Sequence, residues 1–443
     1  MSNPGERLRF TSITLKNWRN FADMTVALPR LAYLVGANGS GKSNFLDAIR
    51  FLHELGAVGG GLRAAVRNRG GMGSLRHLAA PLDATVSVLV EVGNELVPNL
   101  WTYELQFDGA DDPIVVRESL RQREGEDYWR SLHSIVEEGR LLYYLAGRNA
   151  SLFTAVASKD VAAEAGRGSR LVTRRPLVRT YFEDGSAELI AADLVDLFDS
   201  IRYVNINPQI IRNPGSNSAG SNGAYGGALL ESINTDAERD AGRKLAIIAD
   251  ILSKIVPEIA DLKAVRGSYN VPHLYAIHKD ARLGSQPLTE AALSDGTLRL
   301  IGMLWSLLDG DGPLLLEEPE QSWHAGLVQY IPLLLSGAML ATDRQIMVST
   351  HSTELLDSEG IEAEQVLMLQ AEDGASTISQ AASIEDAAAL LAGGEHMSNL
   401  VLGLTEPPEA DLLATYATVG RYGRVQTNGV HDSKQGAEEG QQQ

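Results

Sequence analysis

The chain has 443 residues, of which 44% are hydrophobic, and carries a formal net charge of −19 with a sequence pI of about 4.9. This length and composition suffice for one large α/β domain with an insertion or for two to three domains. The acidic balance argues against a protein that binds nucleic acid over a surface that is basic throughout. Because the sequence has no cysteine, it excludes disulfides, thiolate metal sites and a cysteine nucleophile.

The N-terminus lacks the apolar segment of a signal peptide, and no run of residues predicts a transmembrane helix. We therefore expect a cytoplasmic chain without a membrane partner. The nine histidines are scattered and do not predict a metal cluster.

The first predicted strands lead directly into a glycine-rich loop. Residues 8–15 alternate apolar with polar or charged side chains, which predicts a half-buried strand. Residues 16–21 predict a turn with an aromatic anchor, and residues 24–28 predict a second strand that Pro29 ends. The apolar run 31–35 predicts a third strand immediately before the loop.

The loop Gly36–Ser43 has the form G-x-x-x-x-G-K-S and precedes a helical run over residues 44–52. Its glycines allow backbone amides to turn inward around phosphates, and the helix directs its positive end at the same anion. Lys42 is expected to reach the β- and γ-phosphates and Ser43 to bind Mg²⁺. The predicted nucleotide-binding residues of this loop are Asn38, Gly39, Ser40, Gly41, Lys42, Ser43 and Asn44.

Four arginines follow in the most basic window of the chain, Arg63, Arg67, Arg69 and Arg76. They either contact phosphates of a nucleotide or nucleic acid, or lie in a solvated glycine-rich loop, and the pattern leaves both readings open. Strands with antiparallel alternation are then predicted at residues 85–92, 101–107 and 114–120.

The middle of the chain predicts an amphipathic helix at 192–198, a strand at 203–207, a loop at 213–227 and a helix at 241–255. Heptads are not sustained, so long coiled-coil arms are not expected.

Residues 292–308 predict a helix that Ser294 or Asp295 caps. Its N-terminal amides would point at an anion, although an ordinary capped helix has the same pattern.

The apolar run that begins at Pro313 ends in Glu317, Glu318 and Glu320. The end of a buried parallel strand is where α/β sheets place their chemistry. One acid would hold Mg²⁺ and the next would orient or deprotonate water. Acids packed this closely are expected to repel one another unless a cation lies among them.

A further strand, residues 345–350, leads to His351, which could donate a hydrogen bond to a γ-phosphate or serve a structural role. Residues 366–369 predict the last strand, and residues 384–404 predict helix with a break at Gly393–Gly394. Residues 427–443 are polar and low in complexity, which predicts disorder.

Four motifs follow one another along the chain: the glycine-rich loop, the Leu293–Thr297 segment (L-S-D-G-T), the Glu-Glu-Pro-Glu run and Ser-Thr-His-Ser. Their order resembles that of the ABC-type ATPases of the SMC/RecF/OLD group, and most closely the AAA15 or AAA21 prokaryotic ATPases. The resemblance implies an α/β P-loop ATPase head with a mixed sheet, an inserted α+β region and no long coiled coil. It implies that the ATPase core is formed by residues 1–120 and 285–372, with residues 121–284 inserted between them. Residues 373–426 would form a helical segment, and residues 427–443 a disordered tail.

The same resemblance implies roles for individual residues. Lys42, Glu318 and His351 are expected to be catalytic, and Ser43 with Glu317 to hold Mg²⁺. The family signature contacts nucleotide through Ser294, Asp295 and Gly296. Glu317 departs from the family because an aspartate usually stands there, and no Q-loop glutamine can be placed.

The family also implies partners. Two copies would enclose two ATP molecules head to tail, with the signature of one copy on the nucleotide of the other. Relatives of OLD type append a Toprim nuclease, whereas here Glu406 and Asp411 are interpreted as solitary surface charges. The resemblance thus implies the ATPase subunit of an antiphage defence system that gates a separate effector such as a nuclease. A RecF-like DNA-repair ATPase that binds nucleic acid and a scaffold that hydrolyses ATP slowly are the alternatives.

Overall fold

The computed structural model describes residues 7–56, 61–109, 113–123, 129–137, 140–145, 179–181, 187–189, 192–213, 227–235, 238–267, 270–280, 284–372 and 374–405. All of them belong to one compact unit, Met1–Thr405, and a second unit comprises Glu406–Gln443. The loop expected at 213–227 and the tail expected at 427–443 lie almost entirely or entirely outside the described residues, as do Glu406 and Asp411.

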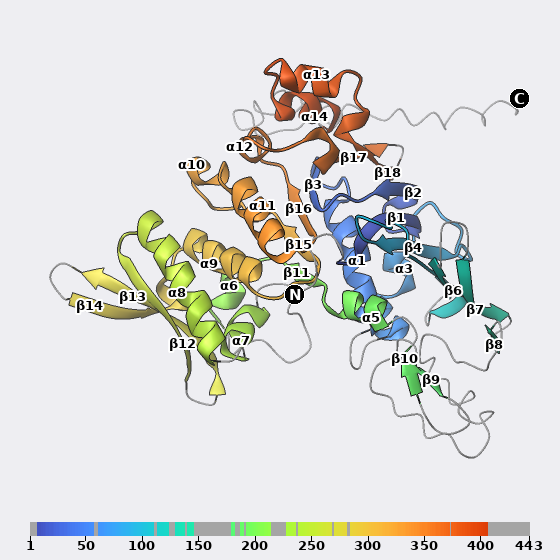
Figure 1. Cartoon of the computed structure of the whole chain (residues 1–443), viewed down its shortest axis with the longest axis horizontal. Coiled ribbons are helices and arrows are strands. Elements are labelled where there is room, and N and C mark those ends of the chain that lie inside the picture. The colour runs from blue at the N-terminus through green and yellow to red at the C-terminus, as the bar shows by residue number, and fades with distance from the viewer. Residues whose placement is uncertain are drawn as a thin grey trace, which may run out of the picture. The chain divides into compact units, whose positions relative to one another are not determined.

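A six-stranded sheet forms the centre of the fold (Figure 1). In spatial order its strands are β11 (Arg202–Val204), β15 (Leu314–Glu317), β16 (Ile346–Thr350), β3 (Leu31–Gly36), β17 (Val366–Glu372) and β18 (Ala375–Gln380). All neighbouring pairs are parallel except β17 with β18. Every residue of β3 and β16 is buried, which explains their uninterrupted apolar runs, because a parallel sheet is covered on both faces.

Alternate residues of these strands point into two separate cores. Leu34 and Met347 belong to the first core, whereas Tyr33 and Val348 belong to the second. Strand β11, from the predicted inserted region, contributes to this central sheet by pairing Val204 with Leu316 of β15.

The first core packs against a seven-stranded antiparallel sheet. Its strands, in spatial order, are β2 (Phe21–Ala27), β1 (Arg9–Trp18), β4 (Val86–Gly93), β5 (Trp101–Asp108), β6 (Ile114–Arg123), β7 (Trp129–Glu137) and β8 (Arg140–Leu145). Helix α1 (Lys42–Gly56) lies in this core, where Phe51 contacts Trp18 edge-on and stacks on Phe107. The strands predicted at the N-terminus and between residues 85 and 120 are confirmed, and β2 begins earlier than expected, at Phe21.

The second core is completed by α8 and α9 and by a three-stranded sheet that the sequence pattern did not reveal. The sheet comprises β12 (Ile259–Arg266), β13 (Pro272–Asp280) and β14 (Gly284–Thr289). Only four residues of β12 and β13, Ile259, Leu262, Leu274 and Ala276, enter the core as buried side chains, which makes the alternation weak.

The helices and a small hairpin complete the fold. The helices are α2 (Leu62–Arg67), α3 (Met72–Leu75), α5 (Ala192–Asp199), α6 (Pro208–Ile211), α7 (Gly227–Thr235), α8 (Glu238–Ile255), α9 (Asp295–Leu308), α10 (Ala325–Val328), α11 (Ile331–Thr342), α12 (Thr353–Leu356), α13 (Ala387–Ala392) and α14 (Met397–Thr405), with a small hairpin of β9 (Arg179–Tyr181) and β10 (Ala187–Leu189). The helices predicted at 192–198, 241–255 and 292–308 are confirmed, and so is the break before α14. The described residues contain no long coiled coil.

The prediction that residues 366–369 form the last strand is wrong. Strand β18 follows β17 after a turn in which Gly374 has φ +82°, and it pairs antiparallel with β17. Its residues Ala375–Gln380 are mostly polar, because β18 is an edge strand with only one buried residue.

The expectation of no membrane-length apolar run also needs correction. Ala325–Thr342 is uncharged and, by length and composition alone, long enough to cross a membrane. In α11 the side chains of Ile331 and Leu335 are buried in the second core, whereas those of Leu333 and Leu340 are exposed, and 22% of the apolar segment is buried. Helix α11 has 12 residues, about 18 Å of rise against the roughly 30 Å of a bilayer core.

Candidate nucleotide site

The glycine-rich loop lies between β3 and α1. Gly39 and Gly41 have φ values of +82° and +105°, which side chains rarely adopt. A Cβ on Gly41 would also lie 2.1 Å from Nδ2 of Asn20. Asn38 and Gly39 are exposed, whereas Ser40 and Gly41 are buried beneath them. The loop therefore presents backbone to an incoming anion without side chains in the way.

The ammonium group of Lys42 lies across this loop. It donates hydrogen bonds to the carbonyl oxygens of Gly36 at 2.6 Å and Ala37 at 3.1 Å. Burial lowers the pKa of Lys42, and the nearby charges of Glu318 and Glu317 act in the opposite direction. The charge is therefore held at the loop by carbonyl oxygens that a phosphate can replace.

Ser43 and Glu317 meet across the carboxyl ends of β3 and β15. The Ser43 hydroxyl donates to Oε1 of Glu317. The other oxygen, Oε2, accepts hydrogen bonds from the Tyr203 hydroxyl and from Nδ2 of Asn205, the latter at 2.9 Å. A hydroxyl and a carboxylate are hard oxygen ligands of the kind that Mg²⁺ binds together with phosphates. The pair therefore fits Mg²⁺.

Glu318 faces His351 at the next position along the same sheet edge. Its Oε1 lies 3.3 Å from Nδ1 of His351, and its Oε2 accepts from the Gln321 side chain. The backbone of Glu318 has φ +41°, a left-handed value that costs about 1–3 kcal/mol for a residue with a side chain. Its amide is held by the carbonyl oxygen of Ser349 at 3.0 Å. This bond keeps a strained residue in place between β15 and β16.

The three glutamates have different hydrogen-bond partners, but their charges still interact, since burial and, to a lesser extent, the charge of Glu318 raise the pKa of Glu320. The expectation that they repel one another unless a cation lies among them stays a prediction. Glu320 is buried and accepts a hydrogen bond from the Thr350 hydroxyl at 2.5 Å. Burial raises its pKa, and the bond from Thr350 lowers it. The three carboxyl groups therefore have different hydrogen-bond partners and share the nearby positive charge of Lys42.

The signature segment stands at the start of α9. Ser294 is the N-cap, and its Oγ accepts from the amide of Thr297 at 3.2 Å. The carboxylate of Asp295 pairs with Arg212 at 2.5 Å, and Arg212 also donates to the carbonyl oxygen of Leu293. Ser294 itself is exposed. The helix end thus presents the exposed Ser294, whose hydroxyl also contacts the Thr297 hydroxyl at 2.8 Å, while Asp295 is paired with an arginine at the end of α6.

Gly296 packs directly against the turn that follows Glu318. A Cβ at this position would lie 2.8 Å from the carbonyl oxygen of Ser322. Ser322 has φ +66°, so this turn is itself in an uncommon conformation. The contact joins the signature segment to the acidic strand end within one chain.

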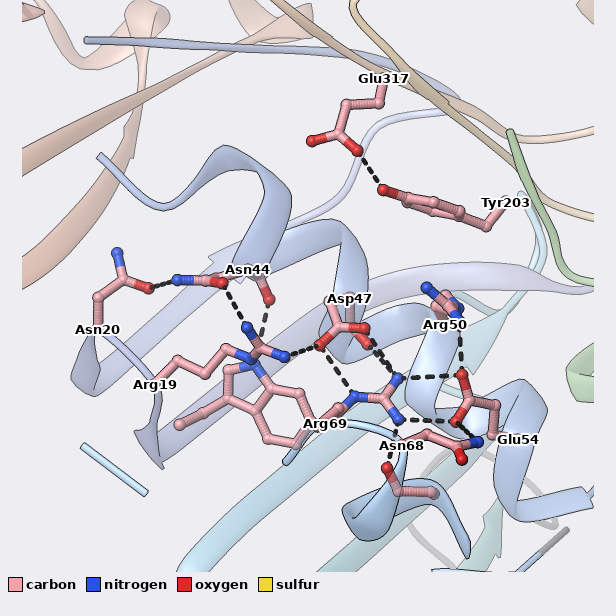
Figure 2. Close-up of polar contacts among 12 residues, drawn as sticks. Arg19, Asn20, Asn44, Asp47, Arg50, Glu54, Asn68, Arg69, Tyr203 and Glu317 are labelled. Carbon is pink, nitrogen blue, oxygen red and sulfur yellow. Dashed lines mark hydrogen bonds and ion pairs between the residues drawn. The ribbon is translucent and has the colours of Figure 1, made fainter. Parts of the chain in front are cut away.

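A polar network ties the β1–β2 turn to α1 (Figure 2). The Asn44 side chain donates to Asn20 at 2.7 Å and accepts from Arg19 at 3.1 Å. Asn20 in turn donates to the Ser40 carbonyl oxygen at 3.2 Å. Asn44, predicted to bind nucleotide, therefore has its side chain committed to holding the loop.

Two of the four arginines of the basic window serve the same scaffold. Arg69 is buried and pairs with Asp47 at 2.8 Å and Glu54 at 2.7 Å, as Figure 2 shows. Arg76 is buried and donates to the carbonyl oxygen of Gly109. Neither is available to a nucleic-acid phosphate, which corrects that reading for both, whereas Arg63 and Arg67 are exposed.

Residues 31–152 and 217–357, together more than half of the chain, match the profile of the AAA_21 family, described as "AAA domain, putative AbiEii toxin, Type IV TA system". The chain belongs to the AAA_21 family. It is therefore a P-loop protein of the SMC/ABC-like ATPase kind, as its sequence motifs imply. The matched segments include the nucleotide loop, the signature segment and both strand ends that carry Glu318 and His351.

Solved structures of SMC heads are similar to the chain at low identity. One is the SMC head domain with an extended coiled coil bound to the C-terminal domain of ScpA from Pyrococcus furiosus, with 14% identity, a TM-score of 0.46, and coverage of 87% of this chain and 99% of that one. Another is the SMC head domain from Thermotoga maritima, with 15% identity, a TM-score of 0.36, and coverage of 84% and 98%. No curated protein matches the chain.

Sequence reasoning missed four residues that contact the site: Tyr203, Asn205, Arg212 and Gln321. Tyr203 and Asn205 were seen only as part of a strand. Their even spacing would place them on one face of a strand end, but the partner strand of β11 could not be identified without the sheet order.

Proposed function

We propose that this chain binds ATP at the Gly36–Ser43 loop and hydrolyses it to ADP and phosphate in the presence of Mg²⁺. The observation that carries the proposal is the convergence of two pairs at one sheet edge: Ser43 with Glu317, and Glu318 with His351. The first pair has the chemistry of a metal site and the second that of a water-activating site.

The chain's own groups divide the reaction between them. Lys42 exchanges its bonds to the Gly36 and Ala37 carbonyl oxygens for bonds to phosphate oxygens. Glu318 accepts a proton from a water molecule whose oxygen attacks the γ-phosphorus, while the bond to the β-phosphate oxygen breaks and ADP leaves with that electron pair. His351 is exposed beside Glu318 and can donate to a γ-phosphate oxygen. Mg²⁺, held by Ser43 and Glu317, would neutralise charge on the β- and γ-phosphates.

We further propose that the site is completed by a second copy of the chain. The exposed Ser294 hydroxyl and the α9 amides suit an oxyanion. No hydrogen bond among the described residues joins Ser294 to the nucleotide loop of its own chain. A head-to-tail dimer would bring this helix end to the γ-phosphate held by the partner subunit, so that ATP stabilises the dimer and hydrolysis releases it.

The biological role that we propose is an ATP-driven switch acting on a separate effector in a prokaryotic defence system. The family description, which names a toxin of a Type IV TA system, supports such a setting. The burial of Arg69 and Arg76 removes part of the support for direct DNA binding.

Glu318→Gln tests the catalytic proposal. The variant should lose about 10²–10⁴-fold of the hydrolysis rate, the usual contribution of a general base, while it still binds ATP. Phosphate release and equilibrium binding of a fluorescent ATP analogue measure the two properties. Analytical ultracentrifugation with ATP and Mg²⁺ should show the variant as a dimer, because the ATP that holds the copies together persists.

Glu364→Gln, on the exposed 3₁₀ turn Ala363–Gln365, is the matched control and should behave as the wild type. Equal hydrolysis by wild type and Glu318→Gln would refute the enzyme proposal. A Glu318→Gln chain that stays monomeric with bound ATP would refute the composite site.

A further inference from the structure

The carboxylate of Glu317 is held from the side that faces away from the nucleotide loop. Tyr203 and Asn205 both donate to Oε2, whereas Ser43 contacts Oε1. Figure 2 shows the Tyr203 hydroxyl pointing at the Glu317 carboxylate. The two donors therefore occupy one oxygen and leave the other directed toward Ser43.

The position of these donors follows from the sheet. Strand β11 is the edge strand beside β15, and the register places Val204 opposite Leu316. Since parallel strands end at the same edge, the carboxyl end of β11 lies beside the carboxyl end of β15. Tyr203 lies in β11 and Asn205 directly follows its last residue, Val204, and both side chains donate to the same oxygen of Glu317.

Tyr203 is itself held in place by the helix that follows the nucleotide loop. The guanidinium carbon of Arg50 lies 5.2 Å from the centroid of the Tyr203 ring. Arg50 also pairs with Glu54 at 3.1 Å on the same helix. A side chain that is packed in this way can fix the rotamer of the group to which it donates.

The need for such support arises from the length of Glu317. A glutamate has one more rotatable bond than an aspartate, and ordering that bond costs conformational entropy each time a metal is held. Two neutral donors on Oε2 remove this freedom beforehand. Tyr203 and Asn205 lie between the segments 31–152 and 217–357 that match the family profile.

We infer that Tyr203 and Asn205 are positioning residues that hold Glu317, a glutamate where the family usually has aspartate, in the rotamer that binds the divalent cation. The inference rests on the proposed ATPase function and names how its metal site is built. It predicts that the two residues determine metal affinity while leaving nucleotide affinity in the absence of metal unchanged.

Tyr203→Phe and Asn205→Ala test the inference in the full-length chain. Mn²⁺ replaces Mg²⁺ as the probe, and electron paramagnetic resonance measures its binding in the presence of a non-hydrolysable ATP analogue. Each variant should weaken Mn²⁺ binding about 3- to 10-fold, as expected for the loss of one hydrogen bond to a charged group. Binding of the analogue in EDTA should stay within about 2-fold of the wild type. Tyr330→Phe, at an exposed tyrosine, is the control that should change neither.

A double-mutant cycle separates positioning from general loss of structure. The shorter carboxylate of Glu317→Asp should not reach Tyr203, so Tyr203→Phe should change Mn²⁺ affinity by less than about 2-fold in that background. Equal effects in both backgrounds would overturn the inference, and so would unchanged Mn²⁺ affinity in both single variants.

The same measurement distinguishes this inference from the ATPase proposal. If the wild type binds Mn²⁺ with the analogue but does not hydrolyse ATP, the ATPase proposal fails and the inference is still decided by the variants. If the wild type binds no Mn²⁺ with the analogue, the inference is overturned as well.

Discussion

The nucleotide loop and the signature segment are the two halves of the proposed site, and the fold prepares them differently. The first half is assembled at the carboxyl ends of four neighbouring parallel strands, and its side chains already contact one another. The second half is a helix end whose Ser294 is exposed and which is held by Arg212 and by the packing of Gly296 on Ser322. Hydrogen bonds between strands fix the positions of the residues at the edge of a sheet. An exposed helix end is positioned by neighbouring segments, and here it is proposed to contact nucleotide bound to a partner subunit.

The largest effect on ATP binding is expected from removing the Lys42 ammonium group of the first half. Lys42→Ala should weaken ATP binding about 100-fold, because charge-assisted hydrogen bonds to phosphate are lost. Equilibrium binding of a fluorescent ATP analogue measures the change. Lys254→Ala is the matched control, since Lys254 is exposed and pairs only with Asp250 on its own helix. Comparable ATP affinity in the Lys42 and Lys254 variants would show that the loop does not bind phosphate as proposed.

The next effect should come from disturbing the contact between the signature segment and the turn after Glu318 within one chain. Gly296→Ala places a methyl group 2.8 Å from the Ser322 carbonyl oxygen, so the turn after Glu318 must move. We expect hydrolysis to fall about 10- to 100-fold, since small displacements of catalytic groups have effects of this size, with ATP affinity nearly unchanged.

Gly242→Ala is the control for this change, because a Cβ at Gly242 on α8 meets nothing within 4 Å. That substitution should raise stability by about 0.5–1 kcal/mol and leave hydrolysis as it is. If both glycine variants hydrolyse ATP equally well, the packing of the signature segment on the acidic turn has no role in the site.

A smaller effect is expected from releasing the signature helix on its other side. Arg212→Met removes the partner of Asp295 and leaves a carboxylate near the position proposed for the γ-phosphate of the partner subunit. Hydrolysis and ATP-dependent dimerisation should weaken about 10-fold, as expected for one unpaired charge at an anion site, and raising the salt concentration should reduce the difference. Arg243→Met, at an exposed position of α8, should have no such effect.

If Arg212→Met loses hydrolysis and ATP-dependent dimerisation to the same extent at every salt concentration, and its melting temperature is lower, Arg212 has a purely structural role.

A residue outside both halves serves as a reference for stability alone. Glu118 is buried in β6 beside Tyr103, whose hydroxyl donates to it at 2.8 Å, and burial raises its pKa to about 8. The folded chain therefore keeps a proton that the unfolded chain loses near pH 4.5. Stability should fall as the pH rises from that value toward 8.

The glutamine of the Glu118→Gln variant cannot ionise, so the stability of the variant should not show this decrease with rising pH. Between pH 5.5 and 7.5 the wild type should lose about 2 kcal/mol more than the variant, measured from urea midpoints. Identical pH dependence in the two proteins would place the titration elsewhere. ATP affinity should be the same in both, because the residue lies outside both halves of the site.

Local patterns along the chain were enough to identify the nucleotide loop, the capped helix at Ser294 and the acidic strand end at Glu317 and Glu318. Each is a short stretch whose chemistry and secondary structure are set by neighbouring residues, such as a hydroxyl that caps the helix it precedes. Alternating and continuous apolar residues likewise predicted several strands, and helical spacing predicted the helix at 241–255.

What the tertiary structure decided is which of these stretches meet. The order β11-β15-β16-β3 brings Tyr203 and Asn205 to Glu317, and the burial of Arg69 turns an apparent phosphate ligand into part of the scaffold. Neither outcome follows from local sequence, because the neighbour of an edge strand and the partner of a buried charge are chosen by contacts between residues far apart in the chain. The spacing of residues along the chain predicts which secondary structure a segment can form, and tertiary packing determines which residues its side chains contact.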